Sequence, residues 1–395
     1  MARIRVSTGL DSTEYFGHFG RPLKSQEMNC GVMGTETTLA CTISHEANID
    51  DGSNTVDTRS SNMVNFFTAP CIQIATLYTD PTGQRRIRVH TFFFTTTTSL
   101  PDIFKAADVD CVLALLTKRA AQAIVSGNEP IAKVRDSIIS KSIHMLYVYR
   151  KFCATSASSG QLILPEALKI LPVSILGLVK SIAFAQPTTS FNERVAALFR
   201  IGWAGPAGIA AYSYPRLYSL GDMPPEAGIR FPPIPTYKLD ESFEPIALPP
   251  SIPACRDHML PNRVMLIDSG FELCTVIGDQ VDPEVISSCF VVKEYAQPNG
   301  AINRALILRG TVPAEDNTSQ TQDPYAERVR KVVERVIEKR FGIQGVHVFN
   351  LDQAHLVRAF IEDKGGNAGF SLGYVEMLKF IHRKIMDLYS SDSIP

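Results

Sequence analysis

The chain has 395 residues, of which 45% are hydrophobic and 20% are charged. This composition is typical of a folded globular protein and excludes global disorder. At roughly 150 residues per domain, the length predicts two or three domains. The 39 lysines and arginines nearly balance the 40 aspartates and glutamates, so the net charge of -1 excludes binding of nucleic acid by bulk charge.

The cysteines are scattered along the chain and include no C-x-x-C pair. This pattern predicts neither a zinc site nor a disulfide framework, and we expect reduced thiols of a cytosolic protein, most of them in the core. The longest apolar runs fall short of the ~18 residues that a membrane-spanning helix needs. The eight cysteines are Cys30, Cys41, Cys71, Cys111, Cys153, Cys255, Cys274 and Cys289.

The region from Met1 to about Thr98 has the alternation of β-strands. Arg3 and Arg5 alternate with Ile4 and Val6, which places the basic side chains on one face of an extended segment. The polar, turn-rich segment from His45 to Ser61 is predicted to be a loop.

A hairpin is predicted further along this region, with strands at Ile72–Tyr78 and Arg85–Thr91 joined by the turn residues Asp80–Gly83. In its second strand Ile87 and Val89 face one way, and the intervening arginines and histidine face the other. We expect a half-buried antiparallel sheet with one basic, solvated face.

From Ser99 to about Ala211 the spacing becomes helical. One helix is predicted to start at Ser99 and Pro101 and to continue to Leu116, and a second follows Pro130. The second helix is predicted to bury an aliphatic stripe and to expose four charged residues. These four residues are Lys133, Asp136, Lys141 and Arg150.

An apolar segment, Gln161–Ser181, is predicted to be a buried packing helix rather than a membrane span or an interaction helix. Pro165 suits a helix start, whereas Pro172 must kink or restart the helix. Lys180 interrupts the apolar run. A further helix begins at Asn192.

The segment from Pro224 to Pro253 contains nine of the 25 prolines, which favours an extended crossing between domains. Beyond it, helices and strands together predict a small α/β module. We expect a hairpin around Asp268-Ser269-Gly270, a short helix after Asp282, a strand at Ile302–Leu308, an amphipathic helix after Asp323, a strand at Val346–Phe349 and a terminal helix at Tyr374–Leu388.

No phosphate-loop, dinucleotide, zinc-protease or nucleophile-elbow motif is present, so we predict no enzyme, no catalytic residues and no metal site. His347, His355 and His382 are isolated and are predicted to be structural. Trp203 is predicted to be a packing anchor rather than a ligand-stacking residue.

A set of motifs occurs in one order along the chain and resembles a known family. The motifs are Arg3-Ile4-Arg5 leading to Thr8-Gly9, the hairpin strand GQRRIRVHT at 83–91, Val134-Arg135-Asp136, LILPEALKILP at 162–172, Tyr214–Tyr218, and Phe360–Lys364 with Tyr374-Val375-Glu376. Together they resemble the C-terminal portion of the cargo-binding subunit of the inner COPII vesicle coat, in the Sec23/Sec24 family. The related GTPase-activating sister subunit does not carry the LPEALKILP pattern.

This resemblance implies a multidomain fold with an antiparallel β-sandwich, an all-α helical domain and an α/β gelsolin-like domain. The expected bounds are a partial sandwich at 1–98, the helical domain at 99–222, a proline-rich crossing segment at 223–253 and the gelsolin-like domain with a C-terminal helix at 254–395. The family's zinc finger and trunk domain lie upstream of this region, so the resemblance implies that the chain is a fragment. We therefore expect no cofactor in this chain and assign to it neither zinc binding nor pairing with the sister subunit.

The resemblance also implies binding residues. Arg3 and Arg5 correspond to arginines that help to bind acidic and hydrophobic-acidic export signals on the cytosolic tails of cargo. Adjacent same-face positions of a strand lie about 6.5 to 7 Å apart, which matches the carboxylates of an extended Asp-x-Glu peptide. Phe19 and Arg21 resemble a pair that contributes to recognition of a SNARE.

Two interpretations are open for the arginines of the second hairpin strand, Arg85, Arg86 and Arg88. They could approach an anionic membrane surface, or they could simply form a solvated face of the sheet. The expected partners are therefore cargo and SNARE tails, the sister subunit in the full-length protein, and anionic membrane, with no nucleic acid. The expected function is a non-catalytic COPII cargo adaptor in transport from the endoplasmic reticulum to the Golgi. The alternatives are a gelsolin-type actin- or calcium-binding module, or an enzyme of unknown type.

Overall fold

The computed structural model describes most of the chain. The described residues are 1–20, 27–34, 37–46, 70–127, 129–154, 158, 160–185, 190–230, 246–296, 302–311, 323–338, 346–350, 360–364 and 371–392. Several sequence predictions lie outside these ranges. They concern Arg21, most of the loop at 45–61, His355 and the middle of the proline-rich segment.

The chain divides into two compact units. The first comprises Met1–Lys169, Val195–Gly205 and His382–Pro395, and the second comprises Ile170–Arg194 and Pro206–Ile381. The four domain bounds expected from the sequence stay predictions.

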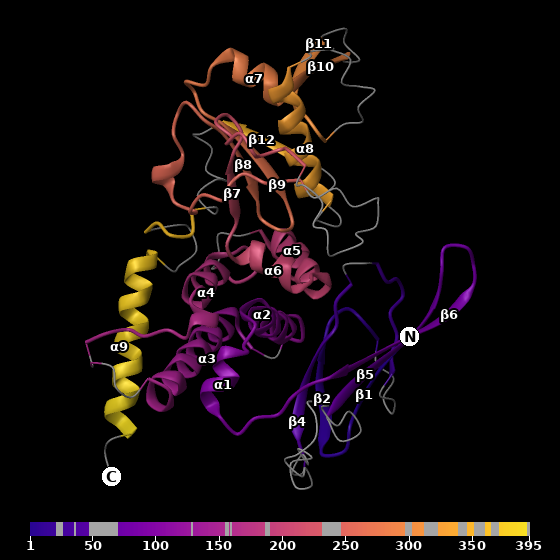
Figure 1. Cartoon of the computed structure of the whole chain (residues 1–395), viewed down its shortest axis with the longest axis vertical. Helices are drawn as coiled ribbons and strands as arrows, with labels where there is room; N and C mark the ends of the chain where they lie inside the picture. Colours follow the sequence, from indigo (N-terminus) through magenta and orange to yellow (C-terminus); the bar gives the residue numbers. More distant parts are fainter. Residues whose placement is uncertain are drawn as a thin grey trace, which may run out of the picture. The chain divides into compact units, whose positions relative to one another are not determined.

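The first unit contains a β-sandwich, as expected (Figure 1). One sheet has the strand order β3-β1-β5-β6, and β2 pairs with β4 in the other. Buried Ala2 and Ile4 of β1 pack with Tyr15 of β2 and Met28 of β3 to form the core between the sheets. The strands are β1 Ala2–Val6, β2 Leu10–Phe16, β3 Glu27–Met28, β4 Ala40–His45, β5 Cys71–Thr79 and β6 Arg85–Phe93.

The predicted hairpin is confirmed as the antiparallel pair β5–β6. Its turn is closed by Asp80, whose Oδ1 accepts hydrogen bonds from the backbone N–H groups of Thr82 and Gln84 at 3.0 Å each. Gly83 adopts φ +86°, a left-handed conformation that glycine tolerates without strain. The turn side chains therefore fix the register of the hairpin.

The predicted burial of this hairpin is wrong. Ile87 and Val89 alternate with the arginines as expected, yet their side chains are 72% and 51% exposed. The strand β6 lies at the edge of its sheet, and the core cluster between the described sheets contains none of its residues. An edge strand that extends past the facing sheet has both faces in solvent, so alternation alone did not predict burial.

The helix predicted from Ser99 to Leu116 is two helices, α1 Leu100–Lys105 and α2 Val109–Val125. The break falls at Asp108, whose side chain accepts hydrogen bonds from the N–H groups of Asp110 and Cys111. An N-cap of this kind satisfies backbone donors that the first turn leaves unpaired, so it starts a new helix.

The second predicted helix is α3, Ile131–Phe152, and its aliphatic stripe is buried as predicted. Arg150 was expected to face water, but it is only 7% exposed. Its guanidinium donates hydrogen bonds to the carbonyl oxygens of Ala154 and Ser158, which lie just beyond the helix. Because a buried cation needs acceptors, this pairing explains why the prediction failed.

The apolar segment at 161–181 is a buried packing element, as predicted. Pro165 precedes a single 3-10 turn, η2 Glu166–Leu168, and Pro172 lies in the first turn of α4, Leu171–Lys180. All ten residues of α4 are buried. The second proline therefore restarts the helix, because its missing N–H is not needed there.

In the second unit, helix α4 packs against α6, Pro206–Ser213, a helix that the sequence analysis did not identify. The remaining helix of this region, α5 Phe191–Trp203, matches the prediction from Asn192 onward. The division between the two units falls within α5.

The second unit also contains a four-stranded sheet with the order β12-β9-β8-β7, in which β12 and β9 are parallel and the other neighbours are antiparallel. The predicted hairpin is confirmed as β8–β9, and the predicted strand before Asn350 as β12. The short strand β7 and the strand β10 were not predicted. The elements are β7 Arg216–Ser219, β8 Val264–Asp268, β9 Leu273–Ile277, α7 Pro283–Cys289, β10 Phe290–Ala296, β11 Ile302–Leu308, α8 Pro324–Glu338 and β12 Val346–Asn350, with a 3-10 turn η3 at Arg256–His258. The division between the units also falls within the terminal helix α9, Tyr374–Asp392, because the residues from His382 onward belong to the first unit.

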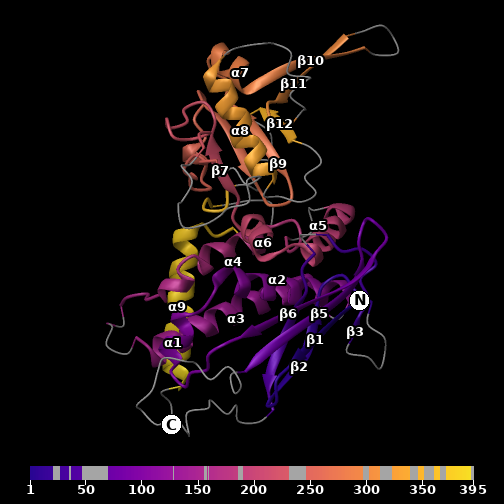
Figure 2. The same cartoon turned by 45° about the vertical axis from the view of Figure 1, so that its right-hand side comes forward.

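Figures 1 and 2 show α8 lying along this sheet. This helix is the predicted amphipathic one, and its valines join the core formed by the strands β7, β8 and β9. The valines are Val329, Val332, Val333 and Val336. This arrangement of helices and strands agrees with the predicted α/β module. Its classification as gelsolin-like stays a proposal.

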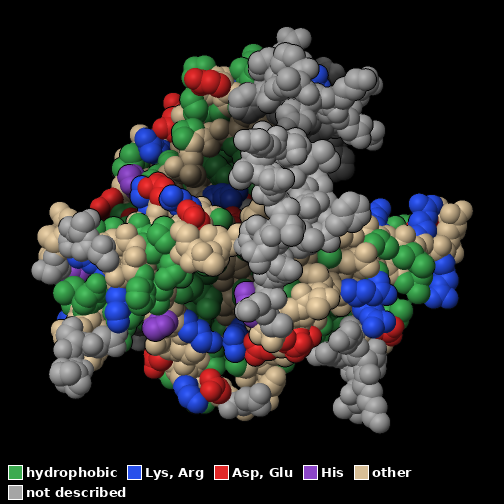
Figure 3. Space-filling view, turned by 60° about the horizontal axis from the view of Figure 1, so that its bottom comes forward, with side chains coloured by type: hydrophobic (Ala, Val, Ile, Leu, Met, Phe, Trp, Pro, Cys, Tyr) green, Lys and Arg blue, Asp and Glu red, His purple; other side chains and the backbone are tan. Residues whose placement is uncertain are grey.

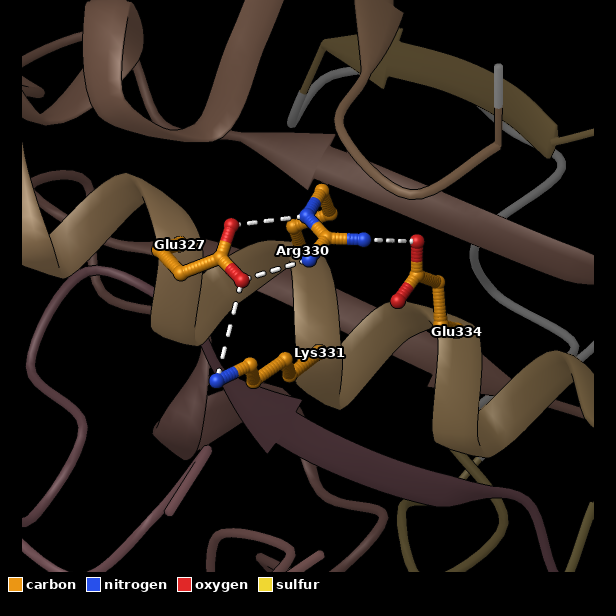
Figure 4. Close-up of polar contacts among 4 residues, drawn as sticks. All are labelled: Glu327, Arg330, Lys331 and Glu334. Atoms are coloured by element: carbon orange, nitrogen blue, oxygen red, sulfur yellow. Dashed lines mark hydrogen bonds and ion pairs between the residues drawn. The ribbon is translucent and has the colours of Figure 1, made fainter. Parts of the chain in front are cut away.

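The outer face of α8 carries an alternating charge network (Figure 4). Arg330 lies between Glu327 and Glu334, with N–O distances of 2.5 Å to each, and Lys331 lies 3.7 Å from Glu327. These pairs hold the pKa of Glu327 below its ordinary value, mainly through the hydrogen bond from Arg330. Acids and bases one turn apart stabilise a solvated helix face.

All eight cysteines are unpaired. The expectation that most of them lie in the core is wrong, because only Cys289 is buried and Cys111 is exposed. Burial raises the pKa values of Cys274 and Cys289 to about 12, so both are protonated thiols at neutral pH.

Candidate functional site

The two arginines expected to bind acidic signals lie on the solvent-facing side of the sheet in the first unit. Arg3 and Arg5 belong to β1, where they alternate with the buried Ala2 and Ile4. Arg5 is exposed and Arg3 is half-buried. The predicted placement of both guanidiniums on one face is therefore confirmed.

Arg5 is oriented by a row of polar side chains that crosses three strands. Its Nη1 donates to Oε1 of Gln73 at 3.0 Å, and Nε2 of Gln73 donates to Oγ1 of Thr91 at 3.3 Å. The backbone register places Arg5 opposite Gln73, and Gln73 opposite Thr91. The guanidinium is thus partly held in place while its remaining N–H groups stay available to a ligand.

Arg3 has a different environment. Its cross-strand neighbours are Ala75 on β5 and Glu27 on β3. The Nε atom of Arg3 is covered and has no hydrogen-bond partner in the described part of the chain. Because this N–H is covered, a carboxylate arriving from solvent can be bound only through the terminal Nη groups of Arg3.

The three arginines of β6 do not form one basic face. The register places Arg86 and Arg88 on the core side of the sheet, whereas Arg85 shares the face of Arg3 and Arg5. Arg86 pairs with Asp80 at 2.8 Å, and the guanidinium of Arg88 lies 5.8 Å from the centre of the Tyr78 ring. In Figure 3, blue Lys and Arg side chains surround the projection at the right, where the β5–β6 hairpin extends in Figure 1. Their approach to an anionic membrane stays a prediction.

The pair expected to contact a SNARE is only partly described. Phe19 is half-buried and packs against the sandwich core, and Arg21 lies outside the described residues. Packing against the core accounts for Phe19 without a ligand. The assignment of Phe19 and Arg21 to a SNARE site stays a prediction.

Trp203, at the end of α5, packs with other rings, as expected of an anchor. The His18 ring lies 4.2 Å from that of Phe199 and 5.6 Å from that of Trp203, measured between centroids. His18 Nε2 also lies 2.6 Å from the carbonyl oxygen of Phe199. A Cβ atom at Gly202 would lie 2.3 Å from Nε2 of His18, so a larger residue there would displace the His18 ring.

Two buried lysines were not identified as structural residues from the sequence. In the first unit Lys118 is 2% exposed, and its Nζ donates to the carbonyl oxygens of Ile201 and Gly202 at the end of α5. Burial lowers the pKa of Lys118 to about 8. The ammonium caps a helix C-terminus, where a cation is favoured.

Lys180 has a similar role in the second unit. Its Nζ donates to the carbonyl oxygens of Ile361 and Asp363 at 2.8 and 2.7 Å. Burial lowers its pKa to about 8, although the nearby Asp363 and Glu376 oppose this shift. The sequence around Lys180 does not indicate that the carbonyl groups that accept its hydrogen bonds lie far along the chain.

The acidic motif at 360–364 is held by the same network. The Tyr214 hydroxyl donates to Oε1 of Glu362 at 2.5 Å and accepts from the N–H of Ala254 at 3.0 Å. The Asp363 carboxylate accepts hydrogen bonds from the Cys255 thiol and the Arg256 N–H. These motif residues therefore tie separate segments of the second unit together.

A cavity of about 320 Å³ lies between α2 and α3 in the first unit. Its wall combines aliphatic side chains with Arg119, Glu129 and Lys141. Arg119 pairs with Glu14, and Glu129 pairs with Lys133. This mixed lining brings together no set of groups suited to acid–base or nucleophilic chemistry.

The described residues contain neither a metal-binding cluster nor a membrane-spanning helix. They contain no group of three or more His, Cys, Asp or Glu side chains placed to hold a metal ion. No helix among them has the length and hydropathy needed to cross a bilayer.

Comparison with protein families matches two regions of the chain. The Sec23/Sec24 beta-sandwich domain matches residues 1–97, and the Sec23/Sec24 helical domain matches residues 108–209. The chain belongs to the Sec23/Sec24 family. This membership confirms the resemblance seen in the motifs and the expected sandwich and helical parts of the fold.

Curated relatives with the same family name match nearly the whole chain. Human protein transport protein Sec24D is 27% identical over 98% of this chain, and human Sec24C is 26% identical over 98%. Protein transport protein sec24 of Aspergillus niger is 30% identical over 86%. The chain spans about a third of the length of these relatives, between 31% and 33%.

A solved structure shares the fold. The crystal structure of the human COPII-coat protein Sec24c aligns with a TM-score of 0.72, covering 98% of this chain and 45% of that chain, at 22% sequence identity. The alignment includes the α/β part of the second unit, since almost the entire chain is covered.

Proposed function

We propose that this chain is the signal-binding portion of a COPII cargo adaptor, which recognises export signals on cargo and SNARE tails during transport from the endoplasmic reticulum to the Golgi. The family membership and the transport names of the relatives support this role. The observation that carries the proposal is the pair Arg3 and Arg5 on the solvent-facing side of β1.

The chemistry of this pair suits acidic peptides. Each guanidinium can donate two parallel hydrogen bonds to one carboxylate. Alternate residues on a strand and in an extended peptide share the same spacing of about 7 Å, so two carboxylates in Asp-x-Glu can meet both arginines together. An exposed ion pair contributes only about 0.2 to 1 kcal/mol, so single tails bind weakly and selection depends on many coat copies on one membrane.

The role needs no catalysis and no cofactor in this chain. In the full-length protein we expect a GTPase-activating sister subunit and an anionic membrane surface as further partners, with the coat assembled at endoplasmic reticulum exit sites. The matches reported above concern protein transport and give no support to a gelsolin-type actin- or calcium-binding module.

A vesicle-budding assay tests the proposal. Arg3→Ala with Arg5→Ala, placed in the full-length protein, is expected to remove cargo with acidic signals from budded vesicles while the protein stays folded. The charge-matched control Lys141→Ala with Lys379→Ala changes two exposed lysines elsewhere. Unchanged packaging of acidic-signal cargo by the arginine variant would refute the site.

A further inference from the structure

The cavity between α2 and α3 exists because α2 presents small side chains to it. Only residues 126–130 separate the two helices, which pack side by side as an antiparallel pair (Figures 1 and 2). Helices pack with their axes about 8 to 10 Å apart, a gap that larger side chains normally fill. Ala120 and Ala123 of α2 each offer only a methyl group there, so about 320 Å³ stays open.

The floor of the cavity is apolar and has room for a small ligand. Ala120, Val134 and Ile138 are buried, and Leu116 and Ala123 are half-buried. A cavity of roughly 150 Å³ with apolar walls binds one benzene molecule, so this cavity accepts a ligand of about twice that size. Ligand pockets in proteins span roughly 300 to 1,000 Å³, which places this one among the smallest. It therefore suits a slender apolar chain.

The charged groups lie at opposite ends of the cavity. Glu129 precedes the first residue of α3, and Lys141 lies about three turns into that helix, or roughly 15 Å along its axis. Arg119 comes before Ala120 and Ala123 on α2, so in an antiparallel pair it lies toward the Lys141 end. The cavity therefore has a cationic end and an acidic end.

The cationic end has hydrogen-bond donors that a ligand can use. Lys141 is exposed and has no acceptor in the described part of the chain. Arg119 donates through Nη2 to Glu14 at 3.2 Å, which leaves its other N–H groups for a ligand. At the acidic end, the Glu129 carboxylate is paired with Lys133 at 2.8 Å. These three cations and two carboxylates leave a net charge of about +1, which favours an anionic ligand.

We propose that this cavity binds a single-chain amphiphile with an anionic head group, in the class of a medium-chain fatty acid. The carboxylate lies at the cationic end, where it accepts hydrogen bonds from Lys141, from the remaining N–H groups of Arg119 and from the Ser137 hydroxyl. The aliphatic chain covers the apolar floor and ends near Glu129, because the reverse orientation would bring two carboxylates together. The volume leaves no room for a lipid with two long chains.

Isothermal titration calorimetry with the whole chain and decanoate, kept below its micelle-forming concentration, tests the inference. Decanoate is expected to bind at a ratio of one to one and about four- to fifteen-fold more tightly than octanoate, because its two extra methylenes are partly or fully buried. Decylammonium has the same chain and the opposite charge. It is expected to bind more weakly than decanoate, and this difference is expected to shrink at high salt.

Two variants each alter one half of the site. Ala123→Leu fills the cavity with a larger aliphatic side chain, so it is expected to weaken decanoate binding at least about ten-fold and to raise the midpoint of thermal unfolding. Lys141→Met removes the charge, and it is expected to weaken decanoate binding about two- to five-fold and to lower the preference over decylammonium. The matched controls Ala196→Leu and Lys379→Met change an exposed alanine and an exposed lysine elsewhere, and both are expected to bind decanoate like the unmodified chain.

The outcomes separate this inference from the proposed function. Equal affinity for octanoate and decanoate would overturn it, and so would undiminished decanoate binding by a folded Ala123→Leu variant. If that variant does not fold, Lys141→Met decides, because unchanged decanoate affinity there would overturn the anionic site. Binding of Asp-x-Glu peptides depends on Arg3 and Arg5 and is expected to stay unchanged in the folded variants, so the cavity can fail while the proposed function stands.

Discussion

The packing of α4 against α6 gives a sharp prediction, because it depends on a missing side chain. A Cβ atom at Gly177 would lie 1.6 Å from the carbonyl oxygen of Ser213 and 2.7 Å from its carbonyl carbon. Ordinary carbon–oxygen contacts are about 3.3 Å or longer, so these two atoms would have to move apart by about 1.7 Å. Every residue of α4 is buried, which leaves the helix little room to move.

We therefore expect Gly177→Ala to destabilise the second unit. Overpacking at a backbone contact costs about 1 to 3 kcal/mol, and the upper end applies because the obstacle is a backbone carbonyl of a buried residue. Alanine favours the helix by about 1 kcal/mol over glycine, so the net loss in the free energy of unfolding is about 2 kcal/mol.

Urea unfolding followed by circular dichroism measures this loss. The control Gly31→Ala introduces a methyl group where no atom lies within 4 Å, and it is expected to change stability by less than about 0.5 kcal/mol. A Gly177→Ala variant as stable as the Gly31→Ala control would refute the close approach of α4 and α6.

Two further predictions concern polar groups that are buried or partly buried. The pKa of Lys118 is about 8 in the folded chain and 10.5 in the unfolded chain. Below pH 8 the folded chain therefore bears the full free-energy cost of burying a charged ammonium. This cost falls as the pH rises from 8 to 10.5, because the folded chain then loses the proton that the unfolded chain retains. The stability of the unmodified chain relative to Lys118→Met should therefore rise by about 3 kcal/mol over this range in urea unfolding, and a difference independent of pH would contradict the buried charge. Tyr214→Phe removes the hydroxyl that joins Glu362 to the Ala254 N–H, and thermal unfolding should show a loss of about 1 to 3 kcal/mol; a variant with unchanged stability would show that the network contributes nothing.

Local patterns predicted much of the fold. The turn residues Asp80 to Gly83 predicted the β5–β6 hairpin, the valine stripe predicted α8, and the two prolines predicted how the apolar segment starts and restarts. Each of these depends on neighbours within a few residues. The break between α1 and α2 also has a local cause, which is the N-cap at Asp108. The sequence analysis predicted one continuous helix there, because the apolar stripe runs through the break.

Other features depend on partners that are distant in sequence. Lys180 is buried because the carbonyl groups of Ile361 and Asp363 accept its hydrogen bonds, and no spacing within α4 encodes this. The alternation of side chains in β6 predicted that this strand has two different faces. It could not show which face lies on the core side of the sheet, because that depends on the register with β5 and β1.

The candidate site illustrates both cases. Placement of Arg3 and Arg5 on one face followed from alternation along a single strand. The row that joins Arg5 to Gln73 and Thr91 followed only from the pairing of three strands.

The central claim is that Arg3 and Arg5 bind acidic tails, and peptide titration tests it most directly. An Asp-x-Glu peptide and a peptide of the same composition with adjacent acids are titrated against the whole chain and its Arg3→Ala, Arg5→Ala variant, at low and high salt. The account predicts that the alternating peptide binds more tightly, that binding weakens at high salt, and that the variant loses the preference. Equal binding of both peptides, or an unchanged preference in the variant, would contradict it.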